Sequence, residues 1–136
     1  MTKIESEKVE INNSTQNLFA FLSNFNNFQK LMPEQVTNWS STEDECSFTI
    51  AGMATIGMKI TEKKPYSEIN IISNGKVPFT FKLKVLLNES GENKSLGQLI
   101  FEADLNPMLK MMVEKPLGNF FNLLVKKLKE INLGSV

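Results

Sequence analysis

The feature that most constrains the fold is an amphipathic segment at residues 107–131. Its apolar residues recur at spacings of three and four, which predicts a helix with an apolar stripe wider than a single face. Pro107 suits the first helical turn, where its missing N–H is not needed. Such a helix is about 37 Å long, and Pro116 should kink it or break it into two pieces. A stripe this wide is either packed into a core or covers an apolar cavity as a lid.

The segment from residue 35 to residue 105 has a different period. Apolar and polar residues alternate there, as in strands with one buried face. We expect six strands, at 35–41, 45–51, 54–61, 66–73, 79–87 and 95–105. The turns between them are polar: Asn74-Gly75 is a favoured hairpin pair, and residues 88–94 form a longer hairpin loop. Consecutive strands joined in this way form an antiparallel meander.

The first 33 residues combine one strand with helices. Residues 3–11 are expected to form an exposed or edge strand, because charged residues interrupt its alternation. Asn13 or Ser14 can cap a helix over 15–23, and residues 24–33 continue as a second short helix or helical turns.

These elements predict one α+β domain spanning residues 1–136. It is a curved antiparallel sheet of about seven strands with two short helices after strand 1. The long C-terminal helix packs across the sheet, because no other element is long enough to cover the apolar face.

The most informative feature of the composition is that Arg and His are both absent. Without His the chain lacks the commonest general acid–base and the commonest metal ligand, and we expect no metal and no cofactor.

The 15 Lys balance 15 acidic residues, with no basic run, which argues against nucleic-acid binding. The single cysteine, Cys46, excludes an intramolecular disulfide and fits a structural residue in a reducing compartment. The sequence shows no signal peptide and no run that could span a bilayer, so we expect a soluble, cytoplasmic protein.

Two stretches carry a resemblance to a known family. They read KVEINNSTQNLFAFLSNFNNFQKLMP and NPMLKMMVEKPLGNFFNLLVKKLKEI. With the order strand, two helices, six strands, helix, the chain resembles the SRPBCC (START-like, helix-grip) superfamily. The resemblance implies an apolar cavity between sheet and C-terminal helix for lipids, sterols, polyketides or plant hormones, and some members are cyclases or dehydratases. It implies no chemistry here: the iron-binding His and the cyclase Arg have no counterpart, and the turn SSTEDECS lacks the glycines of the plant pathogenesis-related branch.

The apolar residues of the strands and the long helix supply the candidate ligand-binding site. We expect the site to be formed by Trp39, Phe48, Met58, Phe81, Leu83, Phe101, Met108, Met112 and Phe120. Trp39, near a mouth, and Tyr66 could each donate a hydrogen bond to a ligand or simply pack. The methionines at 53, 58, 108, 111 and 112 are either an adaptable lining or gap-filling core. Glu102 and Asp104 share one face of the last strand, opposite its apolar residues, and are expected in solvent.

Three functions remain open at this point. The first, which we favour, is binding or carriage of an apolar or amphipathic small molecule, lipid-like or polyketide-like, which requires a cavity of about 300 Å³ or more. The second is a protein-interaction module whose core is filled and which exposes an apolar patch. The third is a weak cyclase- or dehydratase-type enzyme, which requires a carboxylate, Tyr or Lys with a shifted pKa inside the cavity.

Overall fold

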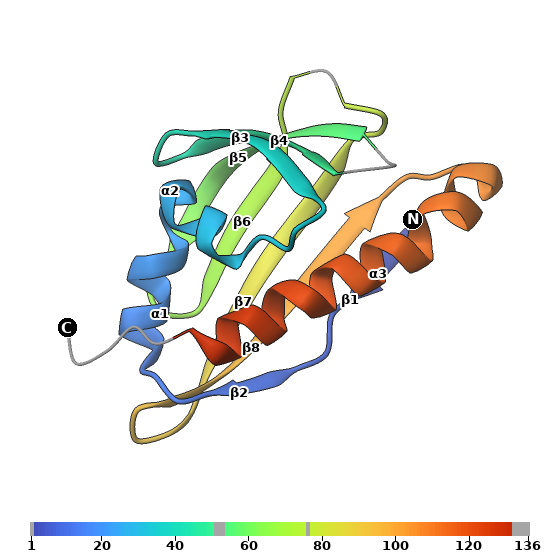
Figure 1. The fold of residues 1–136 in the computed structure, drawn as a ribbon. Coiled ribbons are helices and arrows are strands. Elements are labelled where there is room, and N and C mark those ends of the chain that lie inside the picture. The colour runs from blue at the N-terminus through green and yellow to red at the C-terminus, as the bar shows by residue number, and fades with distance from the viewer. Residues whose placement is uncertain (1, 51–53, 76, 132–136) are drawn as a thin grey trace.

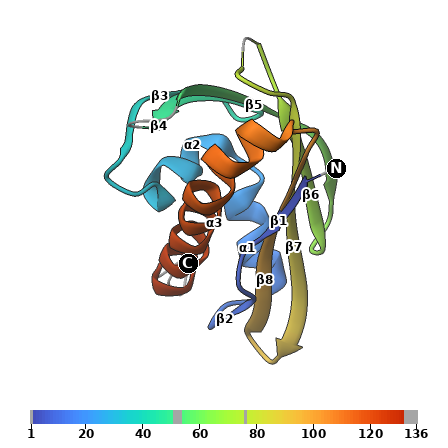
Figure 2. The same cartoon turned by 90° about the vertical axis from the view of Figure 1, so that its right-hand side faces the viewer.

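The computed structural model describes residues 2–50, 54–75 and 77–131. A curved sheet wraps around one long helix, and the short helices close one end of the enclosed space (Figures 1 and 2). The elements follow in the order β1 (Thr2–Glu5), β2 (Val9–Ile11), α1 (Thr15–Leu22), α2 (Phe25–Phe28), the 3₁₀ helix η1 (Gln29–Leu31), β3 (Val36–Ser41), β4 (Glu45–Ile50), β5 (Ala54–Lys64), β6 (Glu68–Ser73), β7 (Phe81–Gly91), β8 (Lys94–Ala103) and α3 (Pro107–Glu130).

The sheet is antiparallel throughout, in the order β1-β8-β7-β6-β5-β4-β3, with β2 also paired to β8. Strands β3 to β8 therefore pair consecutively, and the predicted meander is confirmed. The expected first strand is two edge segments split at Ser6. The Ser6 N–H donates to the Leu99 carbonyl, and the Leu99 N–H donates to Ser6 Oγ, each at 2.9 Å. The Ser6 hydroxyl therefore replaces a missing ladder bond where the edge breaks.

Two turns differ from the sequence prediction. The turn expected at 88–94 is shorter, because β7 continues to Gly91 and β8 starts at Lys94. Tyr66, expected to begin a strand, lies in the turn before β6 with φ of 66°. The Ser67 N–H donates to the Lys64 carbonyl at 3.1 Å across this turn. Pro65 and Tyr66 thus occupy its two central positions, and the second of them takes the left-handed conformation that normally favours glycine.

Helix α3 is continuous across Pro116 and does not break into two pieces. Its first turns are inclined to the rest (Figure 2), as expected where proline removes a helical hydrogen bond. Asn106 caps the helix by accepting a hydrogen bond from the Leu109 N–H at 2.8 Å. Among residues 107–116 only Val113 is buried, whereas a regular apolar face is buried from Leu117 onward. The second part of α3 is therefore the one that packs on the sheet.

The core lies between the concave face of the sheet and this second part of α3. Among the residues that the structure describes, no helix combines the length and apolar character needed to cross a lipid bilayer.

Candidate functional site

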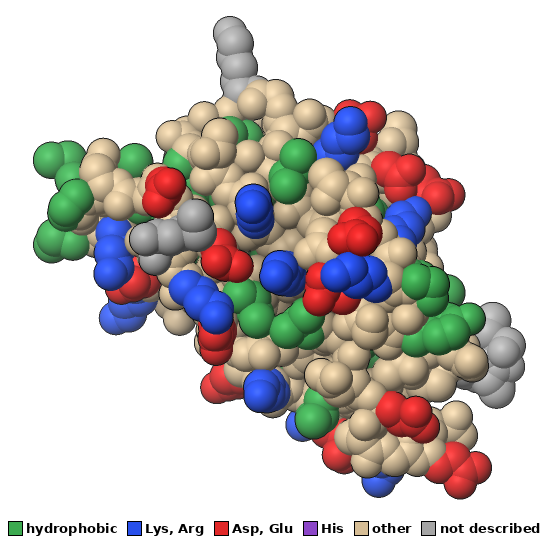
Figure 3. Space-filling model, turned by 180° about the vertical axis from the view of Figure 1, so that it is seen from behind, with side chains coloured by type: hydrophobic (Ala, Val, Ile, Leu, Met, Phe, Trp, Pro, Cys, Tyr) green, Lys and Arg blue, Asp and Glu red, His purple; other side chains and the backbone are tan. Residues whose placement is uncertain are grey.

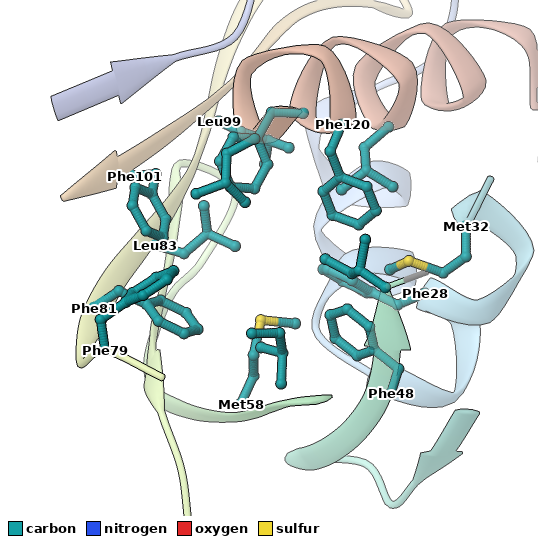
Figure 4. Close-up of a pocket in the computed structure, with 15 residues that line it drawn as sticks. Phe28, Met32, Phe48, Met58, Phe79, Phe81, Leu83, Leu99, Phe101 and Phe120 are labelled. Carbon is teal, nitrogen blue, oxygen red and sulfur yellow. The ribbon is translucent and has the colours of Figure 1, made fainter. Parts of the chain in front are cut away.

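A cavity lies inside the core, between the concave face of the sheet and α3 (Figure 4). The described side chains that line it are all apolar; they belong to Phe28, Met32, Phe48, Ile50, Ile56, Met58, Phe79, Phe81, Leu83, Leu99, Phe101, Leu117, Phe120, Phe121 and Leu124. All of them are buried except Met32, which is half-buried. Met32, in the loop that follows η1, is therefore the most exposed of the described lining residues.

The periods of the secondary structure bring these side chains together. On β7 and β8 the lining residues are two apart, as Phe81 and Leu83 or Leu99 and Phe101, so that they share the concave face. On α3 they are three or four apart, as Leu117, Phe120, Phe121 and Leu124, and form one helical stripe. The helices α2 and η1 add Phe28 and, just after them, Met32.

Two groups of aromatic rings face each other across the cavity (Figure 4). In the first, Phe101 stacks on Phe81 at 5.3 Å between ring centroids and meets Phe79 edge-on at 6.1 Å. In the second, Phe48 on β4 lies nearly parallel to Phe120 on α3, with centroids 6.4 Å apart and planes inclined by 18°. This second pair is a direct aromatic contact between β4 and α3. Phe101 on β8 makes another with Phe121 on α3, with centroids 5.5 Å apart.

Trp39 supports the second group from outside. A register shift in β3 between Thr37 and Ser40, with Asn38 at φ of 56°, forms a bulge beside it. The indole stacks on Phe48 with centroids 5.2 Å apart. Its Nε1–H donates to Ser41 Oγ at 2.9 Å, so its donor is already used.

The cavity brings together six of the nine predicted site residues: Phe48, Met58, Phe81, Leu83, Phe101 and Phe120. Trp39 lies behind Phe48 and is absent from the lining. Met108 and Met112 do not face the cavity, since 72% and 64% of their surface is exposed. The helical stripe alone did not reveal that the first turns of α3 extend past the packed part of the sheet. Met53 lies outside the described residues.

Several lining residues were missed by the sequence-based list, and most of them carried a signal. Leu99 shares the concave face with Phe101, and Phe79 shares the alternation of Phe81. Leu117 and Phe121 belong to the same helical stripe as Phe120. Phe28 and Met32 come from the α2–η1 segment, and no periodicity links that segment to the sheet.

No ionisable side chain among the described residues lines the cavity. Cys46 is buried on β4 outside the lining, and its burial raises the pKa of the thiol to about 12. Asp104 is exposed and Glu102 half-buried, both beside a surface groove that Lys82 also lines. No group of three Cys, Asp or Glu side chains in the described part of the chain is arranged to hold a metal ion. The chemistry available inside this site is therefore apolar contact.

No protein-family model and no curated protein sequence matches the chain. Solved structures do match it. The START superfamily protein of Mycobacterium smegmatis is 14% identical, with a TM-score of 0.75 over 94% of each chain. The protein XoxI of Bacillus cereus is 15% identical, with a TM-score of 0.77 over 96% of this chain and 94% of that one.

A third match is the di-domain aromatase/cyclase BexL from the BE-7585A biosynthetic pathway. It is 10% identical, with a TM-score of 0.75 over 96% of this chain and 46% of BexL. Identities this low establish a common architecture and nothing finer. That architecture, an antiparallel sheet curved around a long C-terminal helix, agrees with the predicted one in the order of its elements and in the position of the helices, with the predicted first strand divided into β1 and β2. The chain therefore has the helix-grip fold of the START-like (SRPBCC) superfamily.

Proposed function

We propose that the chain binds an apolar or amphipathic small molecule in the cavity between the sheet and α3. The observation that carries the proposal is the lining, which is apolar throughout its described residues and includes seven phenylalanines and two methionines. Ligand pockets are mostly apolar and few per protein. The structural similarity to a START superfamily protein and to an aromatase/cyclase supports the same class of ligand.

The lining also restricts which part of the ligand can be buried. No described lining side chain carries a hydrogen-bonding group, so a polar group placed deep in the cavity would lose its water without gaining a side-chain partner. The buried part of the ligand is therefore a hydrocarbon or aromatic moiety. Any polar end lies toward the half-buried Met32, the most exposed of the described lining residues.

Ligand binding requires the cavity to widen. The space that the centre of a water molecule can occupy inside it is about 40 Å³, well below the roughly 300 Å³ of the smallest typical ligand pockets. Phe48 and Phe120, whose rings are 6.4 Å apart, join β4 to α3. Separating these two rings would enlarge the cavity.

The small volume also favours a second candidate function, a protein-interaction module with a filled core. Native mass spectrometry of protein purified from its own host, followed by denaturing extraction, separates the two. Small-molecule binding predicts a stoichiometric apolar compound in the extract. Protein at its bare chain mass that also binds no added lauric acid or naphthalene would favour the interaction module.

A titration can test where the ligand binds. Trp39 is the only tryptophan and stacks on Phe48, which lines the cavity, so its emission should report occupancy. Adding naphthalene or lauric acid should change the emission saturably. Leu83→Phe, which fills part of the cavity, should weaken the response at least tenfold, whereas Lys82→Phe adds the same ring on the solvent face of β7 and should not. Equal responses in the two variants would exclude this cavity as the site.

A further inference from the structure

The beginning of α3 carries an apolar surface that the proposed cavity function does not use. We call residues 107–116 the α3 tip. In it, Met108, Met111 and Met112 have exposed fractions of 72%, 85% and 64%, the highest of any large hydrophobic residue that the structure describes. The tip projects beyond the sheet in Figure 1, and hydrophobic side chains gather at the corresponding left margin in Figure 3. It is a convex apolar projection rather than a groove.

The three methionines share one face of the helix, because positions three and four apart lie side by side. Lys115, four residues after Met111 and three after Met112, extends the same face by one turn. Lys110 is paired with Glu114 on the neighbouring face at 3.9 Å, whereas Lys115 makes no ion pair within the described part of the chain. The helix N-terminus adds partial positive charge at the same end. The acid that precedes the tip, Asp104, lies in the loop before the Asn106 cap. The methionine face is therefore bordered by Lys115, and the acid beside it, Glu114, is paired with Lys110.

The size and shape of this face indicate what it can contact. A stable protein interface uses roughly 20–30 residues on each side, many more than three side chains on a convex tip provide. A lipid interface needs no complementary surface, because each inserted apolar side chain contributes by itself. Unbranched thioether side chains adapt easily to irregular surroundings, and an unpaired lysine is attracted to anionic headgroups.

We propose that the α3 tip inserts Met108, Met111 and Met112 into the interface of an anionic lipid bilayer, with Lys115 at the headgroups. This inference goes beyond small-molecule binding and does not depend on it. The chain attaches at the surface of the bilayer through side chains and does not span it.

The tip lies next to the cavity along α3. Leu117, one residue past the tip, lines the cavity together with Phe120. Between tip and cavity, Pro116 has no N–H to donate to the Met112 carbonyl, so the helix bends more easily there. Only Val113 holds the tip to the core.

The test is binding of the full chain to vesicles, measured by sedimentation. Vesicles of phosphatidylcholine with phosphatidylglycerol are compared with pure phosphatidylcholine, at low and at high salt. The variants are the triple replacement of Met108, Met111 and Met112 by Ser and the single replacement Lys115→Glu. Lys127→Glu is the matched control, since it makes the same charge change on an exposed position at the other end of α3.

The native chain should bind the anionic vesicles more tightly than the neutral ones, and salt should weaken the binding. The triple Ser variant should lose roughly tenfold or more in affinity. Lys115→Glu should lose roughly fivefold or more, and Lys127→Glu should stay near the native affinity. The proposal is overturned if the native chain does not sediment with anionic vesicles, or if the triple Ser variant binds as the native chain does.

Circular dichroism checks that each variant is folded, as we expect because all five substituted positions are exposed. Leu83→Phe, which addresses the cavity, should bind vesicles like the native chain. A failure of the small-molecule proposal therefore leaves this test intact, and a failure here leaves the cavity titration intact.

Discussion

The ring of Phe101 on β8 stacks on the ring of Phe81 on β7, with centroids 5.3 Å apart and planes inclined by 29°. Both rings line the cavity, so part of the surface of each ring borders empty space (Figure 4). Phe25, by contrast, is fully buried at 0% exposure, packs edge-on against Phe28 and is absent from the lining. The two phenylalanines Phe101 and Phe25 therefore differ in how completely they are packed, although both are buried.

Phe101→Ala should cost less stability than Phe25→Ala. Removing a fully packed phenylalanine side chain destabilises a protein by roughly 3–5 kcal/mol, which is the loss expected for Phe25→Ala. Phe101 has fewer contacts to lose because part of its surface already faces a void. Urea denaturation of both variants measures the difference. A loss for Phe101→Ala as large as that for Phe25→Ala would contradict the position of Phe101 at the cavity.

Gly57→Ala should destabilise the protein, whereas Gly118→Ala should stabilise it. A β-carbon at Gly57 on β5 would clash with the backbone carbonyl oxygen of Asn74. Asn74 is held close to Gly57 because the Asn74 N–H donates to the Gly57 carbonyl at 2.9 Å. Relieving this clash requires movement of the backbone, and we expect a loss of at least about 2 kcal/mol.

Gly118 lies within α3, and the β-carbon of an alanine at this position would lie 3.9 Å from a side-chain atom of Ile4, which is an ordinary contact distance. Alanine should add roughly 0.5–1 kcal/mol there. Thermal unfolding of the two variants tests both signs, and a stable Gly57→Ala protein would refute the predicted clash.

The fold was predictable because its determinants are local and periodic. Alternation along the strands defines the meander, and once consecutive strands pair, the apolar face needs a cover that α3 supplies. The Asn74-Gly75 pair does not form the predicted two-residue hairpin turn, because β6 ends at Ser73 and β7 begins only at Phe81. The same alternation, continued along β7 and β8, places Phe81 and Phe101 on the concave face. The positions of these two side chains follow directly from a pattern of period two.

The predictions that were wrong concern side chains whose position depends on elements distant in the sequence. The helical stripe of α3 continues into Met108 and Met112, but how far the sheet extends beneath the helix is not encoded in the helix itself. The bulge at Asn38, which sets Trp39 against Phe48 behind the lining, depends on the register between β3 and β4. The volume of the cavity depends on how all the lining residues pack, and no single segment of sequence determines it.

Ser95→Ala should destabilise the protein more than Ser47→Ala. Ser95 on β8 is completely buried, and its Oγ donates to the Asn13 carbonyl at 2.8 Å, which ties the loop before α1 to the sheet. Removing the hydroxyl leaves that carbonyl without this donor, at a cost of roughly 1–3 kcal/mol. Ser47 is an exposed strand residue, and its replacement should change stability by less than about 0.5 kcal/mol. Denaturant midpoints of the two variants give the comparison, and equal midpoints would show that the Ser95 hydrogen bond contributes little.

Burial of Cys46 should make the stability of the protein depend on alkaline pH. Burial raises the pKa of the Cys46 thiol to about 12, against a smaller lowering by a backbone hydrogen bond at Met58. The thiol of the unfolded chain has a pKa of about 8.5. Below that pH both states keep the proton and the contribution to stability is fully present. As the pH rises further, the unfolded chain loses a proton that the folded chain retains, so the free energy of unfolding falls.

Comparing the native chain with Cys46→Ala between pH 8 and pH 10.5 isolates this effect, because the packing loss of the variant does not depend on pH. The stability advantage of the native chain should shrink as the pH rises. The folded protein should also resist a disulfide reagent at pH 8 and react only after unfolding, since the thiolate is the nucleophile. An advantage that stays constant over this pH range, or rapid reaction of the folded protein, would show that Cys46 is not buried as the structure places it.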